Sequence, residues 1–472
     1  MELLEFIKNY KLKNILPMHM PGHKRNEALA PYLKSLCAGC DMTEINDFDD
    51  LHAPCEILKE CQQRAEDLWH SKHSYYLVNG STCGILAGVR SCTKWGDTVL
   101  VARNCHKSVY NALELCGLKP VYMLPQMLDS MSVYSCITPT DVKQMLDKYK
   151  EIKLVIITSP TYEGIISDIK GIAEVAHSYG VPVLVDEAHG AHLDLSPYFT
   201  GGAVKGGADV VVQSLHKTLP SLTQTAVLHL NSQLVSTKSV QRQLSVFQTS
   251  SPSYLLMSSI DGCVNLLKDS PQLFKSWYNS LQYFKDLVQP LKKLSVLNYN
   301  GSENDISDFD SSKIVISTVR TAINGKDLMD ILRNNYKIEL EMCSADYAIA
   351  MTGMADTKKD LKCLAEALLN IDIAVDSSYR KNICTTVTKL PQQQLTLDKA
   401  EGLPVKNVKT ENSKGMICGE YVWIYPPGIP IITPGEVVNS QTISIIENAV
   451  NNNMNLQKTM SEDNSLISVI AY

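Results

Sequence analysis

Several features that would assign this chain to a class of protein are missing from its 472 residues. No apolar run approaches the roughly 18 residues that a membrane-spanning helix requires, so no membrane partner is expected. The N-terminal residues Met1–Glu5 lack the basic start and the apolar core of a signal peptide. These absences predict a protein of the cytoplasm.

Signatures of nucleic-acid binding and nucleotide hydrolysis are also missing. The net charge of -6 argues against a nucleic-acid partner. The phosphate loop Gly-x-x-x-x-Gly-Lys-Ser/Thr occurs nowhere in the chain. The segment Asp186-Glu187-Ala188-His189 therefore does not indicate a helicase, although it spells the magnesium-binding box of some helicases.

Cysteine is plentiful, but the pairs that a zinc site needs are absent. Cys37 and Cys40 have CxxC spacing, yet no second CxxC follows, so His70 and His73 would have to complete the site. The remaining cysteines, such as Cys83, are scattered through apolar segments, as expected of small buried side chains in a reducing compartment. Neither a structural zinc nor a disulfide is predicted.

The most informative part of the chain runs from Val183 to Thr218. Its apolar runs Val181–Val185 and Asp209–Gln213 are too short for lone helices and are predicted as buried strands. Asp186 ends the first run, and Lys217 follows the second. Open α/β sheets bind ligands at the carboxyl ends of their strands, which predicts a carboxylate near an amine. Desolvation there favours the neutral form of the amine.

An anion-binding segment completes this set. Gly80-Ser81-Thr82 follows the apolar Tyr75–Leu77 and precedes a predicted helix at Ile85–Val89. Glycine lets the backbone approach a ligand closely, and the hydroxyls and the helix N-terminus supply donors. Pyridoxal phosphate (PLP) needs a lysine for its aldehyde, a carboxylate for its protonated ring nitrogen and a cradle for its phosphate. The sequence therefore predicts PLP as the cofactor.

Simpler interpretations of the same residues stay open. Asp186 could cap a turn, with His189 and His192 as satisfied core groups. The two histidines could instead bind a metal, but they lack the His-Glu-x-x-His order and no third ligand is evident. The polar turn at residues 80–82 could be an ordinary helix cap.

Taken together, the chain resembles the Orn/Lys/Arg decarboxylase family, PLP enzymes of the aspartate aminotransferase fold (fold type I), in its shorter form without an N-terminal wing domain. The resemblance covers nearly the whole chain. It implies decarboxylation of arginine, lysine or ornithine to the corresponding di- or polyamine, through a Schiff base and a quinonoid intermediate. It also implies a homodimer or higher homo-oligomer with an active site shared between subunits. The segments that carry it are Met20–Lys24, Asp41–Ile45, Asp49–Pro54, Tyr425–Pro430 and Pro434–Glu436.

The resemblance also implies roles for single residues. Lys217 would form the Schiff base, Asp186 would hold the ring nitrogen, and His106 and Ala188 would cover opposite ring faces. Thr249 and Ser250 would complete the phosphate site of a neighbouring subunit. The implied catalytic residues are Lys217, Asp186, His106 and His216. The implied cofactor-binding residues are Gly80, Ser81, Thr82, His106, Asp186, Ala188, His189, Ser214, His216, Lys217, Thr249 and Ser250. The matched positions implied for substrate binding are Glu341, Glu420, Asp346 and His23.

The type of reaction depends partly on arginine. Aminotransferases of this fold usually clamp the substrate α-carboxylate with an arginine of the C-terminal domain, whereas a decarboxylase must release that carboxylate. No arginine follows Arg380, although Arg320, Arg333 and Arg380 remain candidates. Transamination, a lyase reaction and a non-catalytic PLP-binding role therefore stay open as alternatives.

Strands and helices alternate from Ser71 to His229, which predicts an α/β large domain with a mostly parallel sheet. A smaller α+β unit follows a helix that begins near Pro252, and residues 392–413 are expected to form a linker or exposed loop. The predicted strands are 98–101, 154–158, 183–186, 210–213 and 226–230. The predicted division is 1–55, an N-terminal segment; 56–255, the PLP-binding large domain; 256–390, the small domain; and 391–472, the C-terminal decarboxylase domain.

Overall fold

A seven-stranded sheet lies at the centre of the computed structural model, which describes residues 1–13, 15–25, 32–128, 133–299, 307–378, 385–425 and 428–471. Its parallel strands are β9, β8, β6, β2 and β3, whereas β10 runs antiparallel to both of its neighbours. The predicted mostly parallel sheet is thus confirmed. In sheet order the strands are β1 (His73–Leu77), β10 (Ala226–Leu230), β9 (Val210–Ser214), β8 (Val183–Asp186), β6 (Ile152–Thr158), β2 (Thr98–Ala102) and β3 (Lys119–Met123).

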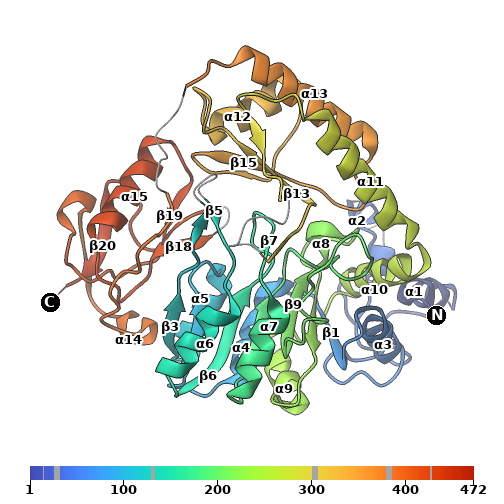
Figure 1. The fold of residues 1–472 in the computed structure, drawn as a ribbon. Coiled ribbons are helices and arrows are strands. Elements are labelled where there is room, and N and C mark those ends of the chain that lie inside the picture. Colours follow the sequence, from blue (N-terminus) through green and yellow to red (C-terminus); the bar gives the residue numbers. More distant parts are fainter. Residues whose placement is uncertain are drawn as a thin grey trace.

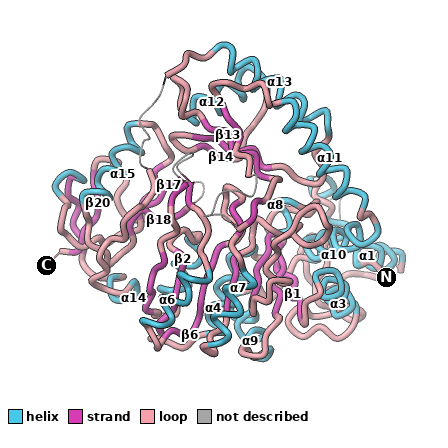
Figure 2. The backbone as a smooth tube through the Cα atoms, in the orientation of Figure 1, coloured by secondary structure: helices cyan, strands magenta, loops and turns pink. Residues whose placement is uncertain are grey.

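Helices cover both faces of this sheet (Figures 1 and 2), and the central strands β8 and β9 are therefore buried along their whole length. Right-handed crossovers place α4 and α5 on one face and α6 and α7 on the other. The contacts agree, because α4 packs on α5 and α9, while α6 packs on α7. These helices are α4 (Gly80–Cys92), α5 (Lys107–Leu115), α6 (Pro139–Lys148), α7 (Ile169–Ser178) and α9 (Thr237–Phe247).

Helix α4 begins earlier than the sequence predicts, so Ser81 and Thr82 lie in its first turn. Gly80 has φ +72°, a left-handed conformation that side chains other than glycine rarely adopt. Gly84 lets the helix lie close to the sheet, because an added Cβ there would come within 2.6 Å of Leu77 and 2.8 Å of Val212. The start of α4 is therefore held near the ends of the strands.

The small unit follows α10 (Tyr254–Asp269), close to the predicted helix start, and lies above the large sheet in Figure 1. It contains an antiparallel four-stranded sheet with helices packed against it. The strands, in sheet order, are β11 (Ser295–Val296), β13 (Lys313–Ser317), β15 (Tyr347–Met351) and β14 (Met342–Cys343). The helices are α11 (Gln272–Leu287), α12 (Gly325–Ile331), which continues as a π-helix over Leu332–Tyr336, and α13 (Lys358–Ala374).

One pair of short strands joins the small unit to the large unit, and a second pair lies between β3 and α6 in the chain. β12 (Asp308–Phe309), which leads into β13, pairs with β7 (Ile165–Ile166), which follows β6. β4 (Met127–Leu128) pairs with β5 (Val133–Tyr134). Lys217 lies in α8 (Leu215–Thr218), the short helix after β9.

The C-terminal unit, red in Figure 1, corrects one expectation. Residues 392–413 are not a plain linker, because they contain α14 (Leu397–Ala400), β16 (Val405–Lys409) and a 3-10 turn, Thr410–Asn412. β16 pairs along its whole length with β20 (Leu466–Ile470). The unit also contains β17 (Val422–Ile424), β18 (Ile429–Ile432), α15 (Ser440–Asn451) and β19 (Leu456–Lys458).

The N-terminal residues pack on the start of the large unit. α1 (Leu3–Leu12) lies against α3 (Ile57–Trp69) and α10, and the backbone N–H of Leu3 donates to Asp261 at 2.9 Å. α2 (Tyr32–Ser35) and a 3-10 turn, Ala38–Cys40, follow. None of the helices in the described ranges is long and apolar enough to cross a membrane. The predicted domain boundaries stay predictions.

Candidate active site

A pocket opens at the carboxyl edge of the central sheet, where the segments that follow four parallel strands meet. His106 follows β2, Thr158 ends β6, Asp186 ends β8 and Lys217 follows β9, and all four line the pocket. Parallel strands bring their carboxyl ends to one edge, which explains why residues so far apart in sequence converge here. Across from them, Glu341 of the small unit also lines the pocket.

Lys217 lies in a strongly desolvated position in this pocket. Its Nζ is 2.9 Å from His189 Nε2. Burial lowers the pKa of Lys217, the negative charges of Asp186 and Glu341 act in the opposite direction, and the positive charge of Lys313 adds to the lowering. The direction is the one expected for an amine that must be neutral to condense with an aldehyde.

Asp186 is buried at the end of β8, where the apolar run predicts it. Burial raises the pKa of Asp186, although Lys217 and the backbone N–H of Ala188 act to lower it. That N–H donates to Asp186 Oδ1 at 3.2 Å, so the carboxylate caps a turn and lines the pocket at once. A cation in the pocket would stabilise its ionised form.

His106 is the N-cap of α5 and not an exposed residue on a turn. Its Nδ1 accepts from the Ser108 backbone N–H at 3.2 Å, which leaves Nε2 to carry the ring proton. Burial lowers the pKa of His106 to about 4, with Lys217 and Lys107 contributing. The ring is therefore neutral at pH 7.

The hydrogen-bond partners of the polar atoms at the site indicate whether its residues fit PLP. In the part of the chain that the structure describes, Ser214 Oγ, Asn104 Oδ1 and His189 Nδ1 are buried without a hydrogen-bond partner. Buried polar atoms are costly unless a partner is supplied, and a ligand can supply it. Together with Ser81 at the start of α4 and the amine of Lys217, they fit a phosphate-bearing aldehyde with a ring nitrogen.

Residues 249–250, which are expected to complete the phosphate site of a neighbouring subunit, lie beside the predicted phosphate-binding residues of their own chain. The backbone N–H of Thr249 donates to Asn79 Oδ1 at 3.0 Å, and Ser250 follows it in an exposed position. His216 precedes Lys217 but turns towards the backbone, since its Nδ1 donates to the carbonyl of Thr225 at 2.9 Å.

Several pocket residues are not predicted from the sequence, and two of them bear on its chemistry. Tyr162 and Glu163 follow β6 and line the pocket. The hydroxyl of Tyr162 is 2.5 Å from Glu341 Oε1, and its ring centroid is 4.4 Å from that of His189. Glu163 is buried and accepts from the hydroxyl of Tyr347 at 2.8 Å. The strand-end rule that identified Asp186 points to Thr158, and Tyr162 and Glu163 lie four and five residues beyond it in the following turn.

Glu341 lies in the pocket, as expected, whereas the other acidic candidates lie elsewhere. Glu420 is fully buried in the C-terminal unit and accepts from the backbone N–H groups of Ser461 and Ser468, at 3.0 and 2.6 Å. Asp346 is buried in the small unit, directly before β15.

Two histidines named from the sequence also lie outside the pocket lining. His23 Nε2 contacts Asp41 at 3.1 Å in the N-terminal segment. His192, considered as a metal ligand, contacts Asp310 and Thr218 instead. Among the described residues, no group of three or more His, Cys, Asp or Glu side chains is arranged to hold a metal.

Comparisons with known proteins agree with this arrangement. A sequence profile of the Orn/Lys/Arg decarboxylase major domain matches residues 2–338, and a profile of the C-terminal domain of these enzymes matches residues 381–452. An arginine decarboxylase of Bacillus anthracis is 30% identical over 458 residues, which are 94% of this chain and 92% of that protein.

Solved structures extend the likeness to the fold. A lysine decarboxylase of Francisella novicida has a TM-score of 0.82 at 16% identity, covering 100% of this chain and 81% of its own. A serine palmitoyltransferase of Sphingomonas wittichii has a TM-score of 0.55 at 13% identity, covering 67% of this chain and 77% of its own. The predicted α/β architecture of fold type I is thereby confirmed. The chain belongs to the Orn/Lys/Arg decarboxylase family and is a decarboxylase.

Proposed function

We propose that this protein uses PLP to decarboxylate a basic L-amino acid, arginine, lysine or ornithine, to the corresponding amine. One observation carries the proposal: a desolvated lysine and a buried aspartate share a pocket with the carboxylates of Glu341 and Glu163. Lys217 and Asp186 suit the cofactor. Glu341 and Glu163 suit a cationic substrate side chain, because carboxylates near a pocket favour positive charge there.

Lys217, Asp186, His106, Ser81 and Ser214 are the residues that would hold PLP. When bound, PLP supplies an electron sink for the pair left on Cα as CO₂ departs. Positioned acids and bases give about 10²–10⁴-fold, roughly 3–5 kcal/mol, whereas enzymes lower barriers by about 8–23 kcal/mol. Acid–base groups alone therefore do not account for the rate.

The protein's own residues keep this pocket in the required protonation states. Asp186, as a carboxylate, would keep a proton on the ring nitrogen. His189 Nε2, at 2.9 Å from Lys217 Nζ, accepts a hydrogen bond from the neutral lysine. Burial, with the charges of Lys217 and Lys313, keeps the pKa of His189 well below its usual range, so its ring is a neutral acceptor at pH 7.

Decarboxylation is favoured over transamination by the pocket lining. In the described part of the chain this lining includes no arginine to clamp an α-carboxylate. Arg320 is exposed, and Arg333 is exposed and pairs with Glu339 at 3.0 Å. Arg380 lies outside the described residues, as do Pro426 and Pro427 of the C-terminal motif. An unclamped carboxylate can turn out of the ring plane and leave.

We further propose a homodimer of the cytoplasm, with Thr249 and Ser250 of one subunit near the phosphate of the other. The position of Thr249 beside the α4 cradle is consistent with a dimer axis close to that point. Sedimentation of the purified protein with and without PLP tests the dimer. A monomer that turns over at full rate would contradict it.

The proposed function is tested by incubating the purified protein and PLP with arginine, lysine or ornithine and identifying the amine and CO₂ formed. We expect one amine to dominate. Glu341→Gln should weaken turnover of the basic substrate, since it removes a charge at the pocket. Glu339→Gln, at an exposed and ion-paired position nearby in sequence, is the matched control. Formation of a keto acid without CO₂ would refute decarboxylation.

A further inference from the structure

A cluster of buried ionisable side chains lies outside the pocket lining, in contact with the segments that carry His189 and Lys217. It consists of Asp310, Lys313 and His192, all with 0% exposed side chains. Asp310 lies between β12 and β13, and Lys313 is the first residue of β13. His192 comes from the large unit, in the segment after β8. The cluster therefore spans the contact between the small and large units.

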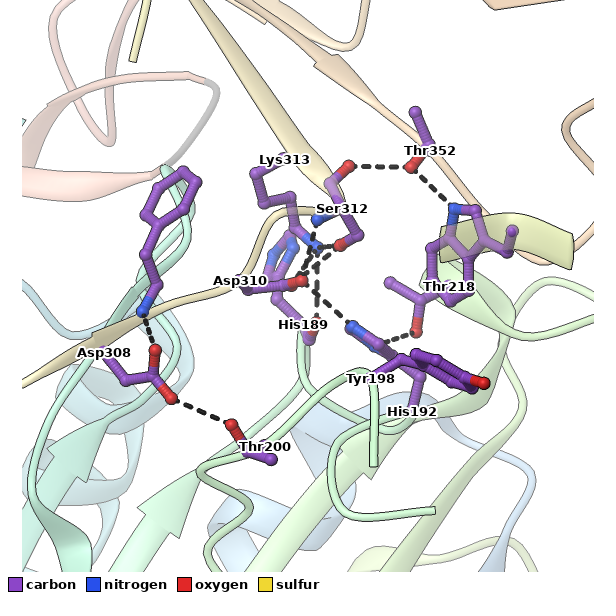
Figure 3. Close-up of polar contacts among 12 residues, drawn as sticks. His189, His192, Tyr198, Thr200, Thr218, Asp308, Asp310, Ser312, Lys313 and Thr352 are labelled. Carbon is purple, nitrogen blue, oxygen red and sulfur yellow. Dashed lines mark hydrogen bonds and ion pairs between the residues drawn. The ribbon is translucent and has the colours of Figure 1, made fainter. Parts of the chain in front are cut away.

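Every charge in this cluster has a partner, as Figure 3 shows. Lys313 Nζ lies 3.0 Å from Asp310 Oδ2, and His192 Nε2 lies 3.1 Å from Asp310 Oδ1. Ser312 adds a hydroxyl that donates to Asp310 at 2.8 Å. Burial alone would raise the pKa of Asp310, but Lys313, His192 and Ser312 together hold it well below its usual range. Asp310 is therefore a carboxylate at pH 7.

The cluster contacts both segments that bear on the reactive amine. Lys313 Nζ donates to the backbone carbonyl of His189 at 3.4 Å, and the ring of His189 lies against Lys217. His192 Nδ1 is 3.2 Å from the hydroxyl of Thr218, the residue directly after Lys217. Because His192 Nε2–H donates to the carboxylate, Nδ1 accepts from Thr218. One cluster thus contacts the backbone of His189 and the side chain that follows Lys217 in sequence.

The same cluster is connected to the acidic side of the pocket through the small sheet. Lys313 begins β13 and pairs with Met351 of β15. The backbone N–H of Glu341 donates to the carbonyl of Ile349, which is also in β15, at 3.0 Å. The antiparallel strands β13 and β15 therefore join the cluster to Glu341, the carboxylate expected to bind the substrate side chain. A second tie joins the units, since Thr200 donates to Asp308 at 3.0 Å.

The stability of the fold alone does not explain why Asp310 and Lys313 are buried between the two units. Desolvating an ammonium and a carboxylate is costly, and replacing such a pair by apolar side chains of similar volume is often neutral or stabilising. A buried polar cluster specifies one arrangement of the groups that it joins, because any displacement leaves a charge without its partner. A defined distance between Glu341 and Lys217 is what recognition of one side-chain length requires.

We propose that Asp310, Lys313 and His192 are positioning residues that set the separation between Glu341 and Lys217, and so match the pocket to one length of basic side chain. The proposal rests on the proposed function. It assigns the choice among arginine, lysine and ornithine partly to residues that do not touch the substrate.

The test compares three variants. Asp310→Asn removes one charge, Asp310→Leu with Lys313→Met removes both, and Lys326→Met with Asp330→Leu removes an exposed pair of α12 as the control. We expect the buried double variant to stay folded and to retain PLP, but to unfold at a lower urea concentration than wild type, because the Ser312 N–H and His192 Nε2–H lose their acceptor. Its kcat/KM should fall on the order of 10- to 100-fold. Its preference among the three amino acids should shift about tenfold. The control should match wild type.

A second readout does not require turnover. The pH titration of the absorbance of PLP linked to Lys217 reports the surroundings of that amine, which include Asp186, Glu341, His189 and Lys313. We expect its midpoint to shift in both buried variants. If wild type forms no amine, the proposed function fails; if wild type forms an amine and the buried double variant keeps its substrate preference, only the inference fails. A buried double variant with wild-type substrate preference and wild-type midpoint would overturn it.

Discussion

The ion pair of Arg103 and Glu436 gives a sharp test of how the C-terminal unit is held on the large unit. The guanidinium Nη2 lies 3.1 Å from Glu436 Oε2, and both side chains are 0% exposed. Arg103 follows β2, and its guanidinium lies 5.4 and 5.2 Å from the ring centroids of Tyr110 and Tyr122. The backbone N–H of Thr433 also donates to Glu436, at 2.8 Å.

The perturbation is Glu436→Leu, which leaves the Arg103 cation buried without its carboxylate. Breaking a buried pair from one side costs about 3–5 kcal/mol, whereas replacing both partners by apolar side chains is often neutral. The orphaned N–H of Thr433 adds about 1–3 kcal/mol in either case. We therefore expect a loss of roughly 4–8 kcal/mol for Glu436→Leu but only about 1–3 kcal/mol for Arg103→Met with Glu436→Leu.

Arg103→Met alone should show a pH dependence of known sign. Burial raises the pKa of Glu436, while Arg103 and Thr433 act to lower it. Without Arg103, the folded protein binds the proton of Glu436 more tightly than the unfolded chain does. The variant should therefore be least destabilised at low pH and lose stability as the pH rises through the raised pKa.

Urea unfolding, monitored by circular dichroism, measures these differences in the free energy of unfolding. They appear as shifts of the midpoint urea concentration when the slope of free energy against urea concentration is unchanged. The reasoning is refuted if Glu436→Leu lies within about 1 kcal/mol of wild type, or if the double variant is as unstable as the single one.

Three further outcomes are expected. Burial raises the pKa of Glu187 to about 8 from 4.5, so the folded state holds a proton between those values that the unfolded chain releases. At roughly 1.36 kcal/mol per pKa unit, the free energy of unfolding should then fall by about 5 kcal/mol as the pH rises across that window. In Glu187→Gln the midpoint of urea unfolding should depend less on pH. Gly84→Ala should destabilise the protein by about 1–3 kcal/mol, because the added methyl group overpacks the contact between α4 and the sheet. Gly262→Ala, in an open position of α10, should stabilise it by roughly 0.5–1 kcal/mol. Thermal unfolding of the two variants measures the difference. Asp186→Asn should retain PLP, seen by its absorbance, but release no CO₂; full activity would remove Asp186 from its assigned role.

The positions of Asp186 and Lys217 could be predicted because two local signals suffice for them. A short apolar run between turn residues identifies a buried strand, and the residue at its end is then placed at the ligand-binding edge. The structure confirms both strands, β8 and β9. Thr158 at the end of β6 obeys the same rule, whereas Tyr162 and Glu163 lie four and five residues beyond it, in a turn that the rule does not place.

Other elements depend on tertiary contacts that no local pattern reveals. β3 contains Lys119 and Pro120, which argue against a strand, but it lies at the edge of the sheet, where a proline is tolerated. β16 is largely exposed and polar, so residues 392–413 looked like a linker; only its pairing with β20 makes it a strand. Glu420 could not be separated from a ligand-binding acid, because its hydrogen-bond partners lie about 40 or more residues away in sequence.

The protonation states of the pocket have one physical origin. Burial pushes Lys217 towards its neutral form and Asp186 towards its protonated form, while it keeps His106 and His189 neutral. A neutral amine is useful to an aldehyde, but a protonated aspartate is of no use to a ring nitrogen that must stay charged. A cationic ring nitrogen beside Asp186 would favour the carboxylate again, since an opposite charge counteracts desolvation. The energetic cost of burying Asp186 is therefore reduced by the same ligand that needs the lysine to be neutral.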